Sequence, residues 1–262
     1  MSRIKYGMPT LIELKSLWDN IILCKELNLD FIEINMNEPK YTNKNLLKYK
    51  EEIRKEDIFF TLHLNEFIDF TNFDKTIRKA FISSVLETIK IAKELGIKKL
   101  VLHLIPGIVF TLPTEVIHIY NAYEDEYLEH AVFFRNTCER AIGKSNIKIC
   151  IENTPVTYFP FMKNCVKTLL KSEVFALTYD IGHDHLGKNK DTEFIYENKN
   201  KISHFHIHDA DKSDHLGLGD GKLDIKEKLI LAKEVKGTCV IEIKTVEALK
   251  NSIHYLNINS LK

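Results

Sequence analysis

Residues 203–221 read SHFHIHDADKSDHLGLGDG and hold four of the chain's eleven histidines, together with four aspartates. Side chains in a β-strand alternate between two faces, so His204, His206 and His208 share one face, while Phe205 and Ile207 share the other. Such a strand suits a sheet whose apolar face packs on helices and whose polar face lines a site. Core packing does not require this many histidines, and the stretch therefore predicts a functional site.

Short β-rich runs alternate with longer helical patterns along the whole chain, which is typical of a parallel sheet covered by helices. Strands are expected at residues 4–7, 30–35, 58–63, 99–103, 147–152, 175–180, 202–208 and 238–244. Helices are expected at residues 11–27, 43–55, 74–95, 124–142, 161–170, 191–198, 225–235 and 245–256. Eight strand–helix pairs in 262 residues predict an α/β protein, with residues 1–262 forming a single (β/α)8 TIM barrel domain.

Composition limits the classes of partner and the compartment. Lysine plus arginine equals aspartate plus glutamate at 37 each, so the overall charge gives no attraction to nucleic acid or to an acidic membrane. The five cysteines are scattered without a C-x-x-C pair, which indicates reduced thiols. The N-terminus shows no apolar signal segment, and no apolar run approaches the roughly 18 residues of a membrane span. We expect a cytoplasmic protein without a membrane segment.

In a TIM barrel the functional groups come from the C-terminal ends of the strands and the loops that follow them. Six consecutive expected strands carry a side chain there that can bind a metal: His63, His103, Glu152, Asp180, His206 and Glu242. Apolar neighbours such as Ile151 and Tyr179 alternate with these residues, which directs the polar side chains away from the helices. Glu33 lies in the middle of the second strand, where it could line the cavity or bridge to a lysine below.

Four of these residues form a mixed oxygen and nitrogen set on neighbouring strands: Glu152, Asp180, His206 and Glu242. Such a set suits a divalent ion, namely Mn²⁺, Zn²⁺, Mg²⁺ or Co²⁺. Because a buried carboxylate without a partner is costly, the set requires either a metal or a compensating basic cluster. A salt-bridge network with lysine and histidine is the alternative.

The remaining histidines are assigned according to their place along the strands and loops. His63, His103, His183 and His215 are candidates for additional metal ligands, with hydrogen-bonded structural groups as the alternative. His208 and Asp209 are candidates for binding substrate or orienting a ligand. His204 and His185 are expected to be structural or to support a ligand. Packing or surface roles are expected for His118, His130 and His254.

These motifs resemble the xylose isomerase-like TIM barrel superfamily over essentially the whole chain. This superfamily includes sugar phosphate isomerases/epimerases and the endonuclease IV type AP endonucleases. The matching pieces are LHL at His63, VLHLIPG at His103, IENT at Glu152, YDIGH at Asp180, FHIHD at His206, DHLGLGDGKLD at His215 and IEIK at Glu242. Together they are specific, although no single one is.

The resemblance to the ketose 3-epimerases of the superfamily implies an activity and roles for residues. One metal would be held by Glu152, Asp180, His206 and Glu242 and would chelate adjacent oxygens of a sugar, stabilising an enediolate. Glu152 and Glu242 would be the catalytic residues that abstract and return a proton. His183 resembles the histidine that contacts substrate. The implied function is a metal-dependent sugar or sugar-phosphate isomerase or epimerase with a small-molecule substrate.

The resemblance to the AP endonucleases implies an alternative, a zinc-dependent phosphodiesterase on abasic DNA. The same four residues, together with His63, His103, His183, His215 and one more aspartate, would build a three-zinc site. Ser213 stands where that family has the aspartate, and Asp214 or Asp211 could substitute. The basic and aromatic insertions that enter a duplex are not found after His63, so nucleic acid is the less expected partner.

The match to the epimerases also departs in one place, since the arginine that those enzymes carry after strand 7 has no counterpart in DADKSDHLGLG.

The segment at residues 107–127 is long and apolar, which suits a lid, a substrate wall or a contact between two copies, with a buried structural loop as the alternative. A contact between two copies through this segment would form a homodimer. A catalytically silent ligand-binding barrel and a lyase are the further alternatives at the level of function.

Overall fold

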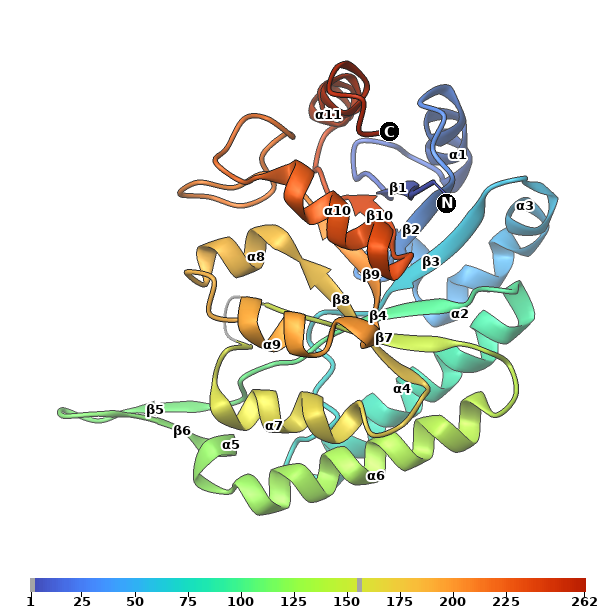
Figure 1. The fold of residues 1–262 in the computed structure, drawn as a ribbon. Coiled ribbons are helices and arrows are strands. Elements are labelled where there is room, and N and C mark those ends of the chain that lie inside the picture. The colour runs from blue at the N-terminus through green and yellow to red at the C-terminus, as the bar shows by residue number, and fades with distance from the viewer. Residues whose placement is uncertain (1–2, 155–156) are drawn as a thin grey trace.

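The computed structural model describes residues 3–154 and 157–262 of the chain. Within this part, eight parallel strands close into a barrel, and helices surround it (Figure 1). Neighbouring strands pair in the order β1, β10, β9, β8, β7, β4, β3 and β2, which in turn pairs with β1. The prediction of a (β/α)8 TIM barrel is therefore confirmed.

The barrel strands lie close to their expected places. They are β1 (Lys5–Pro9), β2 (Phe31–Asn35), β3 (Phe59–His63), β4 (Lys99–His103), β7 (Lys148–Glu152), β8 (Phe175–Asp180), β9 (Ile202–Ile207) and β10 (Thr238–Ile241). The expected eighth strand, residues 238–244, was too long at its end. Glu242 still donates its N–H to the carbonyl of Ile207, but Ile243 then bonds back to Ile241 and turns the chain out of the ladder.

The helices differ more from expectation than the strands do. They are α1 (Leu17–Glu26), α2 (Asn43–Leu46), α3 (Lys50–Lys55), α4 (Lys75–Leu95), α5 (Ile119–Ala122), α6 (Glu124–Ile142), α7 (Pro160–Leu169), α8 (Ile181–Leu186), α9 (Thr192–Glu197), α10 (Ile225–Val235) and α11 (Val246–Ile258). The expected helix 11–27 begins only at Leu17, because Ser16 and Asp19 form a capping box there. The expected helix 43–55 is interrupted by a 3-10 turn over Leu47–Tyr49.

Helix α4 shows how local sequence sets an element that packs on the barrel. The Asp74 carboxylate accepts the N–H groups of Thr76 and Ile77 at 2.8 and 3.1 Å, which caps the N-terminus. Gly96 ends the helix in the left-handed region with φ of 78°, a conformation that side chains with a Cβ disfavour. Between these ends Val85 and other apolar residues are buried in the hydrophobic core. Among residues 3–154 and 157–262, none of the helices combines the length and the hydrophobicity of a membrane-spanning segment.

The segment at residues 107–127 forms an arm instead of a buried loop. Strands β5 (Val109–Thr111) and β6 (Val116–His118) pair as an antiparallel hairpin that projects from the barrel, with α5 at its base (Figure 1). All three residues of β5 are exposed. Only the base is buried, where the Tyr120 hydroxyl donates to Asp69 at 2.6 Å.

Candidate active site

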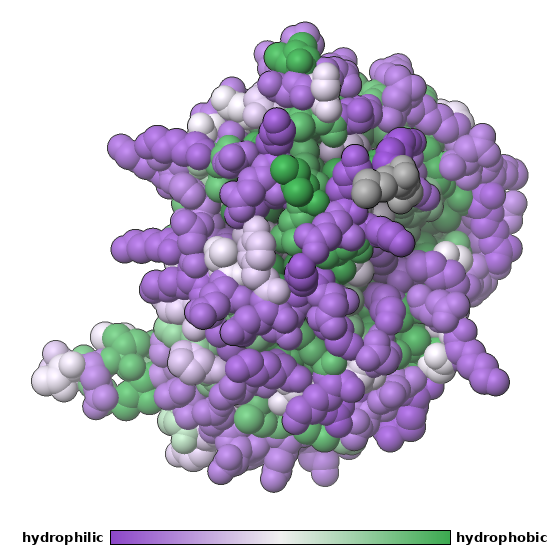
Figure 2. All heavy atoms as spheres, in the orientation of Figure 1, coloured by the Kyte–Doolittle hydropathy of each residue, from purple (hydrophilic) through white to green (hydrophobic). Residues whose placement is uncertain are grey.

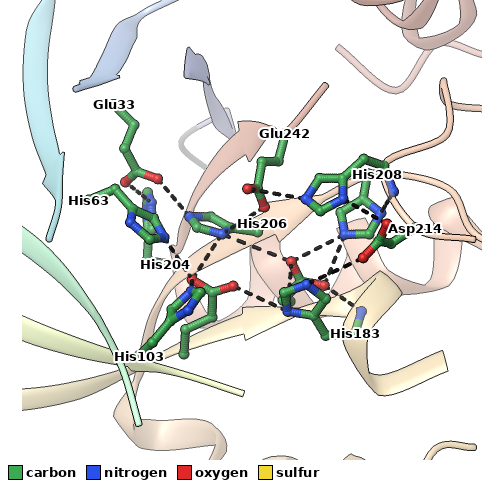
Figure 3. Close-up of polar contacts among 12 residues, drawn as sticks. Glu33, His63, His103, His183, His204, His206, His208, Asp214 and Glu242 are labelled. Carbon is green, nitrogen blue, oxygen red and sulfur yellow. Dashed lines mark hydrogen bonds and ion pairs between the residues drawn. The ribbon is translucent and has the colours of Figure 1, made fainter. Parts of the chain in front are cut away.

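Polar side chains converge at the C-terminal ends of the strands (Figure 3). Glu152 ends β7, Asp180 ends β8, His206 lies on β9 and Glu242 follows β10. A register shift between β8 and β9 places Asp180 level with His206. One donor atom from each of the four side chains lies within 4.8 Å of all the others. The structure thus brings together the four residues predicted as metal ligands.

The His206 ring faces two different partners. Its Nε2 lies 2.7 Å from Oε1 of Glu33, and because a carboxylate only accepts, Nε2 carries the proton. Its Nδ1 lies 3.0 Å from Oε2 of Glu242 and 3.2 Å from Oε2 of Glu152. Burial lowers the pKa of His206, but the carboxylates of Glu152, Glu242 and Glu33 raise it more, well above its ordinary value. A metal at this position would replace the Nδ1 proton, because histidine binds a metal through the lone pair of a neutral imidazole nitrogen.

Glu33 is a supporting residue that the sequence left undecided. Its side chain is buried, and its Oε2 accepts hydrogen bonds from Thr61 Oγ1 at 2.8 Å and from His204 Nε2 at 3.0 Å. Burial raises the pKa of Glu33, but His206 and His204 lower it more, so the carboxylate is charged. The prediction that Glu33 lines the interior of the barrel is confirmed. The alternative prediction, that Glu33 bridges to a lysine below it, is wrong.

Lys99, which lies below Glu33, makes its hydrogen bonds to other residues. The Lys99 ammonium donates to the hydroxyl of Thr238 at 2.8 Å and to the carbonyl of Ser203. The Thr238 hydroxyl in turn lies 2.6 Å from Nδ1 of His204. A buried chain of hydrogen bonds therefore runs up the barrel from Lys99 to His204 and Glu33, and fixes the imidazole above it.

Unsatisfied atoms test whether this pocket suits a metal. Among the described residues, Glu152 Oε2, His206 Nδ1, Glu242 Oε2 and His103 Nε2 are buried without a hydrogen-bond partner. Orphaned polar atoms of this kind each cost about 1–3 kcal/mol unless a further group satisfies them. Three carboxylates and one imidazole are a donor set for a divalent cation. The residues present fit such an ion.

Two further histidines approach Glu152 from β3 and β4. His103 Nε2 lies 3.0 Å and His63 Nε2 lies 3.5 Å from Oε2 of Glu152. His63 Nδ1 lies 2.9 Å from the carbonyl of Leu64, which accepts its proton and turns Nε2 toward the carboxylate. Burial lowers the pKa of His63, but Glu152 raises it more, to about 9. A proton on the ring can thus balance the carboxylate, as the salt-bridge alternative requires, or a second cation can.

The opposite side of the centre carries a pair of histidines near the solvent. His183 Nδ1 lies 3.4 Å from Oε1 of Glu152, and His215 Nε2 lies 3.3 Å from Oε1 of Glu242. Each glutamate therefore presents Oε2 to His206 and Oε1 to a histidine at the mouth. His215 adopts a φ of 54°, so its position is held at a cost in backbone strain.

Asp214 lies close to the position at which the resemblance implies an aspartate. Asp214 lies with its Oδ1 3.1 Å from His215 Nδ1 and its Oδ2 3.9 Å from His183 Nε2. Asp211 is instead paired with Lys222 at 2.8 Å. Of the two possible substitutes for the aspartate missing at Ser213, Asp214 is the one that reaches the histidines.

His208 and Asp209 are fully enclosed by protein. The Nε2 of His208 donates to Asp180 Oδ1 at 3.1 Å, while its Nδ1 accepts the N–H of His215 at 2.8 Å. A Cβ on Gly182 would lie 1.9 Å from this ring, so glycine is needed where α8 passes. Asp209 accepts three backbone N–H groups, from Ala210, Gly219 and Leu223, through its carboxylate. The geometry assigns His208 to orienting Asp180, and Asp209 to holding the loop.

Sequence reasoning missed residues that follow directly after strands. Asn153 clamps Asp180 by accepting its N–H at 2.8 Å and donating to its carbonyl at 2.9 Å. On the other side of the centre, beside Glu242, the mouth opens into a cavity of about 830 Å³ lined in part by Asn35, Asn65 and Glu66. Asn35 and Asn65 lie at or just after the ends of β2 and β3, and that position was the available signal.

Comparison with known proteins is consistent with this architecture. A family model described as "Xylose isomerase-like TIM barrel" matches residues 21–258. The uncharacterized protein MJ1311 of Methanocaldococcus jannaschii is 25% identical, covering 97% of this chain and 91% of that protein. The uncharacterized protein MJ1614 of the same organism is 27% identical over 72% of this chain and 71% of its own length.

Solved structures share the fold over nearly the full chain. A D-tagatose 3-epimerase-like protein superposes with a TM-score of 0.78 at 24% identity, covering 98% of both chains. The 3-keto-D-glucoside 4-epimerase YcjR from E. coli gives a TM-score of 0.76 at 15% identity, with 99% of this chain and 100% of that chain covered. The IOLI protein with a bound zinc atom gives 0.75 at 19% identity over 98% of each chain.

Proposed function

The chain belongs to the xylose isomerase-like TIM barrel family, and from this premise we propose that it is a divalent-metal-dependent isomerase or epimerase of a sugar or sugar phosphate. One structure with the same fold is described as a D-tagatose 3-epimerase-like protein, and another as a 3-keto-D-glucoside 4-epimerase. One neighbour is described with bound zinc. Zn²⁺ or Mn²⁺ is the proposed ion, with Mg²⁺ or Co²⁺ as alternatives.

The observation that carries the proposal is the paired arrangement of Glu152 and Glu242. Their Oε2 atoms lie 3.2 and 3.0 Å from His206 Nδ1, at the centre of the four-residue cluster. Their Oε1 atoms lie near His183 and His215 instead. Each glutamate would thus keep Oε2 at the centre and use Oε1, which faces a histidine at the mouth, to exchange a proton with a substrate.

Glu152, Asp180, His206 and Glu242 would hold the cation, which would act as a Lewis acid that polarises a carbonyl oxygen and acidifies the adjacent C–H group. Oε1 of one glutamate would take that proton, and Oε1 of the other would return one. His183 and His215 orient these oxygens from the mouth. Removal on one face of the carbon and return on the other gives an epimer.

A phosphodiesterase on abasic DNA is the second candidate, and one observation favours it. Beyond the central four residues, His63 and His103 meet at Glu152, while Asp214 lies between His183 and His215. These two groups are where further metal ions would bind. The acidic residues Glu38 and Glu66 line the adjoining cavity and disfavour a nucleic acid backbone there.

The test combines metal content with proton exchange. The protein is reconstituted with Mn²⁺ or Zn²⁺ and incubated with ketoses in D₂O, and deuterium at the carbon beside the carbonyl is read by NMR. We expect exchange that falls by at least about 100-fold in Glu152→Gln. The control is Glu87→Gln, an exposed residue on the outside of α4.

Other outcomes separate the alternatives. Three metal ions per chain, with incision of an abasic duplex that is lost in Glu152→Gln, would establish the hydrolase instead. A protein that binds no divalent metal after reconstitution and exchanges no proton would contradict both enzymatic proposals and favour a silent ligand-binding barrel.

A further inference from the structure

We propose, building on the isomerase or epimerase function above, that the substrate is an uncharged polyhydroxylated ketone and not a phosphate ester. The cavity of about 830 Å³ beside the centre includes Glu242 in its wall, so a substrate reacting there would extend into it. The hydrogen-bonding groups and charges of this wall decide what the rest of the substrate can be.

Two carboxamides in the wall keep their donors available. The side-chain oxygen of Asn35 accepts the N–H of Asn37 at 2.9 Å, and that of Asn65 accepts the N–H of Phe67 at 3.0 Å. These bonds fix each amide with its NH₂ group directed to the other side. Within the described residues neither NH₂ group has a protein acceptor, so both can donate to a ligand.

The wall also carries acceptors. Glu66 uses one oxygen, Oε1, to accept the Asn37 amide at 2.9 Å, and Glu38 is paired with Lys40 at 2.9 Å. Both carboxylates have remaining lone pairs, which accept from O–H groups. A sugar hydroxyl both donates and accepts, so it matches a wall of amide donors and carboxylate acceptors. A phosphate oxygen at neutral pH only accepts, and it would leave the carboxylates without a partner.

The charges of the cavity wall also favour an uncharged substrate. Three carboxylates line this cavity, from Glu38, Glu66 and Glu242. The lysine in the wall, Lys244, lies 3.5 Å from Oε1 of Glu242 and is already paired with it. A phosphate ester brings about 1.5 to 2 further negative charges, which this wall would repel.

The arginines lie elsewhere in the described part of the chain. Arginine is the usual bidentate partner of phosphate. The side chains of all five are bonded away from the cavity: Arg3 to Asp30, Arg54 to Glu94, Arg78 to Asn72, Arg135 to Thr168 and Arg140 to Thr137. Phe67, which is 72% exposed, also lines the cavity, and its ring offers an apolar face to the C–H groups of a sugar.

The experiment compares matched substrates on the metal-loaded protein. Each free ketohexose and ketopentose is assayed beside its terminal phosphate ester, both for deuterium exchange in D₂O and for binding by calorimetry. We expect the free sugar to bind and exchange at least about tenfold better, which corresponds to about 1.4 kcal/mol. Inorganic phosphate should not compete with the sugar in the calorimetric titration.

A charge-changing variant tests the wall directly. Glu66→Lys should shift the ratio of free sugar to phosphate ester by about tenfold toward the ester, whereas the matched Glu87→Lys on the outside of α4 should leave it unchanged. Glu66→Gln provides a milder change in the same direction if the lysine variant folds poorly.

The outcomes distinguish this inference from the function on which it rests. Exchange confined to phosphate esters, or competition by inorganic phosphate, would overturn the substrate class while supporting the isomerase or epimerase. No exchange with any member of either set would overturn both.

Discussion

Among the residues that the structure describes, the His206 ring makes a hydrogen bond at Nε2 but not at Nδ1. The hydrogen bond of 2.7 Å from Nε2 to Glu33 fixes the tautomer, and this leaves Nδ1 without a hydrogen-bond partner between two glutamates. Glu33 itself is oriented by Thr61 and His204. Glu33 on β2 thus orients the His206 imidazole, a proposed metal ligand on β9, from across the barrel.

We predict that Glu33→Gln weakens metal binding by about 10- to 100-fold, the usual effect of losing a partner that orients a metal-binding histidine. A glutamine offers one acceptor where the carboxylate offers two, so its NH₂ group must oppose either His204 or His206. Calorimetric titration with Mn²⁺ measures the affinity. Nitrogen NMR of the His206 ring reports the tautomer in the metal-free protein, a signal that a merely structural role would not move.

The control is Glu87→Gln, which is exposed and remote. An unchanged dissociation constant for Mn²⁺ in Glu33→Gln, together with a His206 ring still protonated at Nε2, would show that Glu33 does not position this ligand.

The residues of the centre could be predicted because they lie at the ends of strands, and the end of a strand can be located from the sequence alone. Once Glu152 and Asp180 are placed at the ends of buried strands, barrel closure brings them together. The role of Glu33 could not be predicted, because it depends on whether Lys99 reaches upward or toward Thr238, a matter of side-chain packing. The choice of Asp214 over Asp211 depends on the path of one loop.

At the level of elements, the strands were more predictable than the helices. Alternating apolar residues locate a strand to within a few residues, whereas an amphipathic pattern continues through a break such as the 3-10 turn at Leu47–Tyr49. Helix α8 was not predicted because it has only six residues, and its N-cap is Asp180, the last residue of β8. That cap, with the Asp180 carboxylate accepting the N–H of His183, is what brings His183 to the site.

Helix α9 begins beside a buried carboxylate whose ionisation affects stability. Asp191 lies 3.4 Å from the Lys163 ammonium, yet its Oδ1 has no hydrogen-bond partner within the described residues. Burial raises the pKa of Asp191 from 3.8 to about 6, more than Lys163 lowers it. The folded protein therefore favours the protonated acid. Stability from this group is present below pH 4 and is lost as the pH rises through about 6.

We predict that Asp191→Asn raises the free energy of unfolding at pH 7.5 relative to wild type by about 1–2 kcal/mol, with less gain at pH 4.5. Urea denaturation at the two pH values measures the difference. Glu193→Gln, exposed on the same helix, serves as the control. A variant less stable than wild type at pH 7.5 would show that the pairing with Lys163 outweighs the cost of burial.

For the whole molecule, the centre links neighbouring strands of the barrel, so its occupancy should affect global stability. Without a cation, the carboxylates of Glu152, Asp180 and Glu242 depend on neighbouring histidines for balance. A metal at 100 times its dissociation constant adds about 2.7 kcal/mol, or roughly 5–10 °C in Tm for a chain of this length. Calorimetric scans with Mn²⁺ and with EDTA should show this shift in wild type and lose it in Asp180→Asn. Equal Tm values for wild type in both buffers would contradict metal binding at this site.

The arm formed by β5 and β6 carries apolar side chains into solvent (Figure 2). Ile108, Phe110 and Val116 are 66%, 54% and 56% exposed. Within the described residues the hairpin pairs with no other strand, so both outer edges are free. A two-stranded sheet is marginal alone, and free edges pair readily with other strands.

We propose that this arm binds the arm of a second copy, because identical edges related by a two-fold axis can pair and cover the apolar side chains of both hairpins. Light scattering after size exclusion should give a dimer at about 100 µM and dissociation on dilution. The double variant Phe110→Ser and Val116→Ser should be monomeric with an unchanged circular dichroism spectrum. The control Ile258→Ser, which changes a 64% exposed residue on α11, should remain dimeric. A wild-type monomer at this concentration would contradict the proposed dimer and leave the arm free to serve as a lid. If deletion of the arm then made proton exchange faster, the lid role would be contradicted as well.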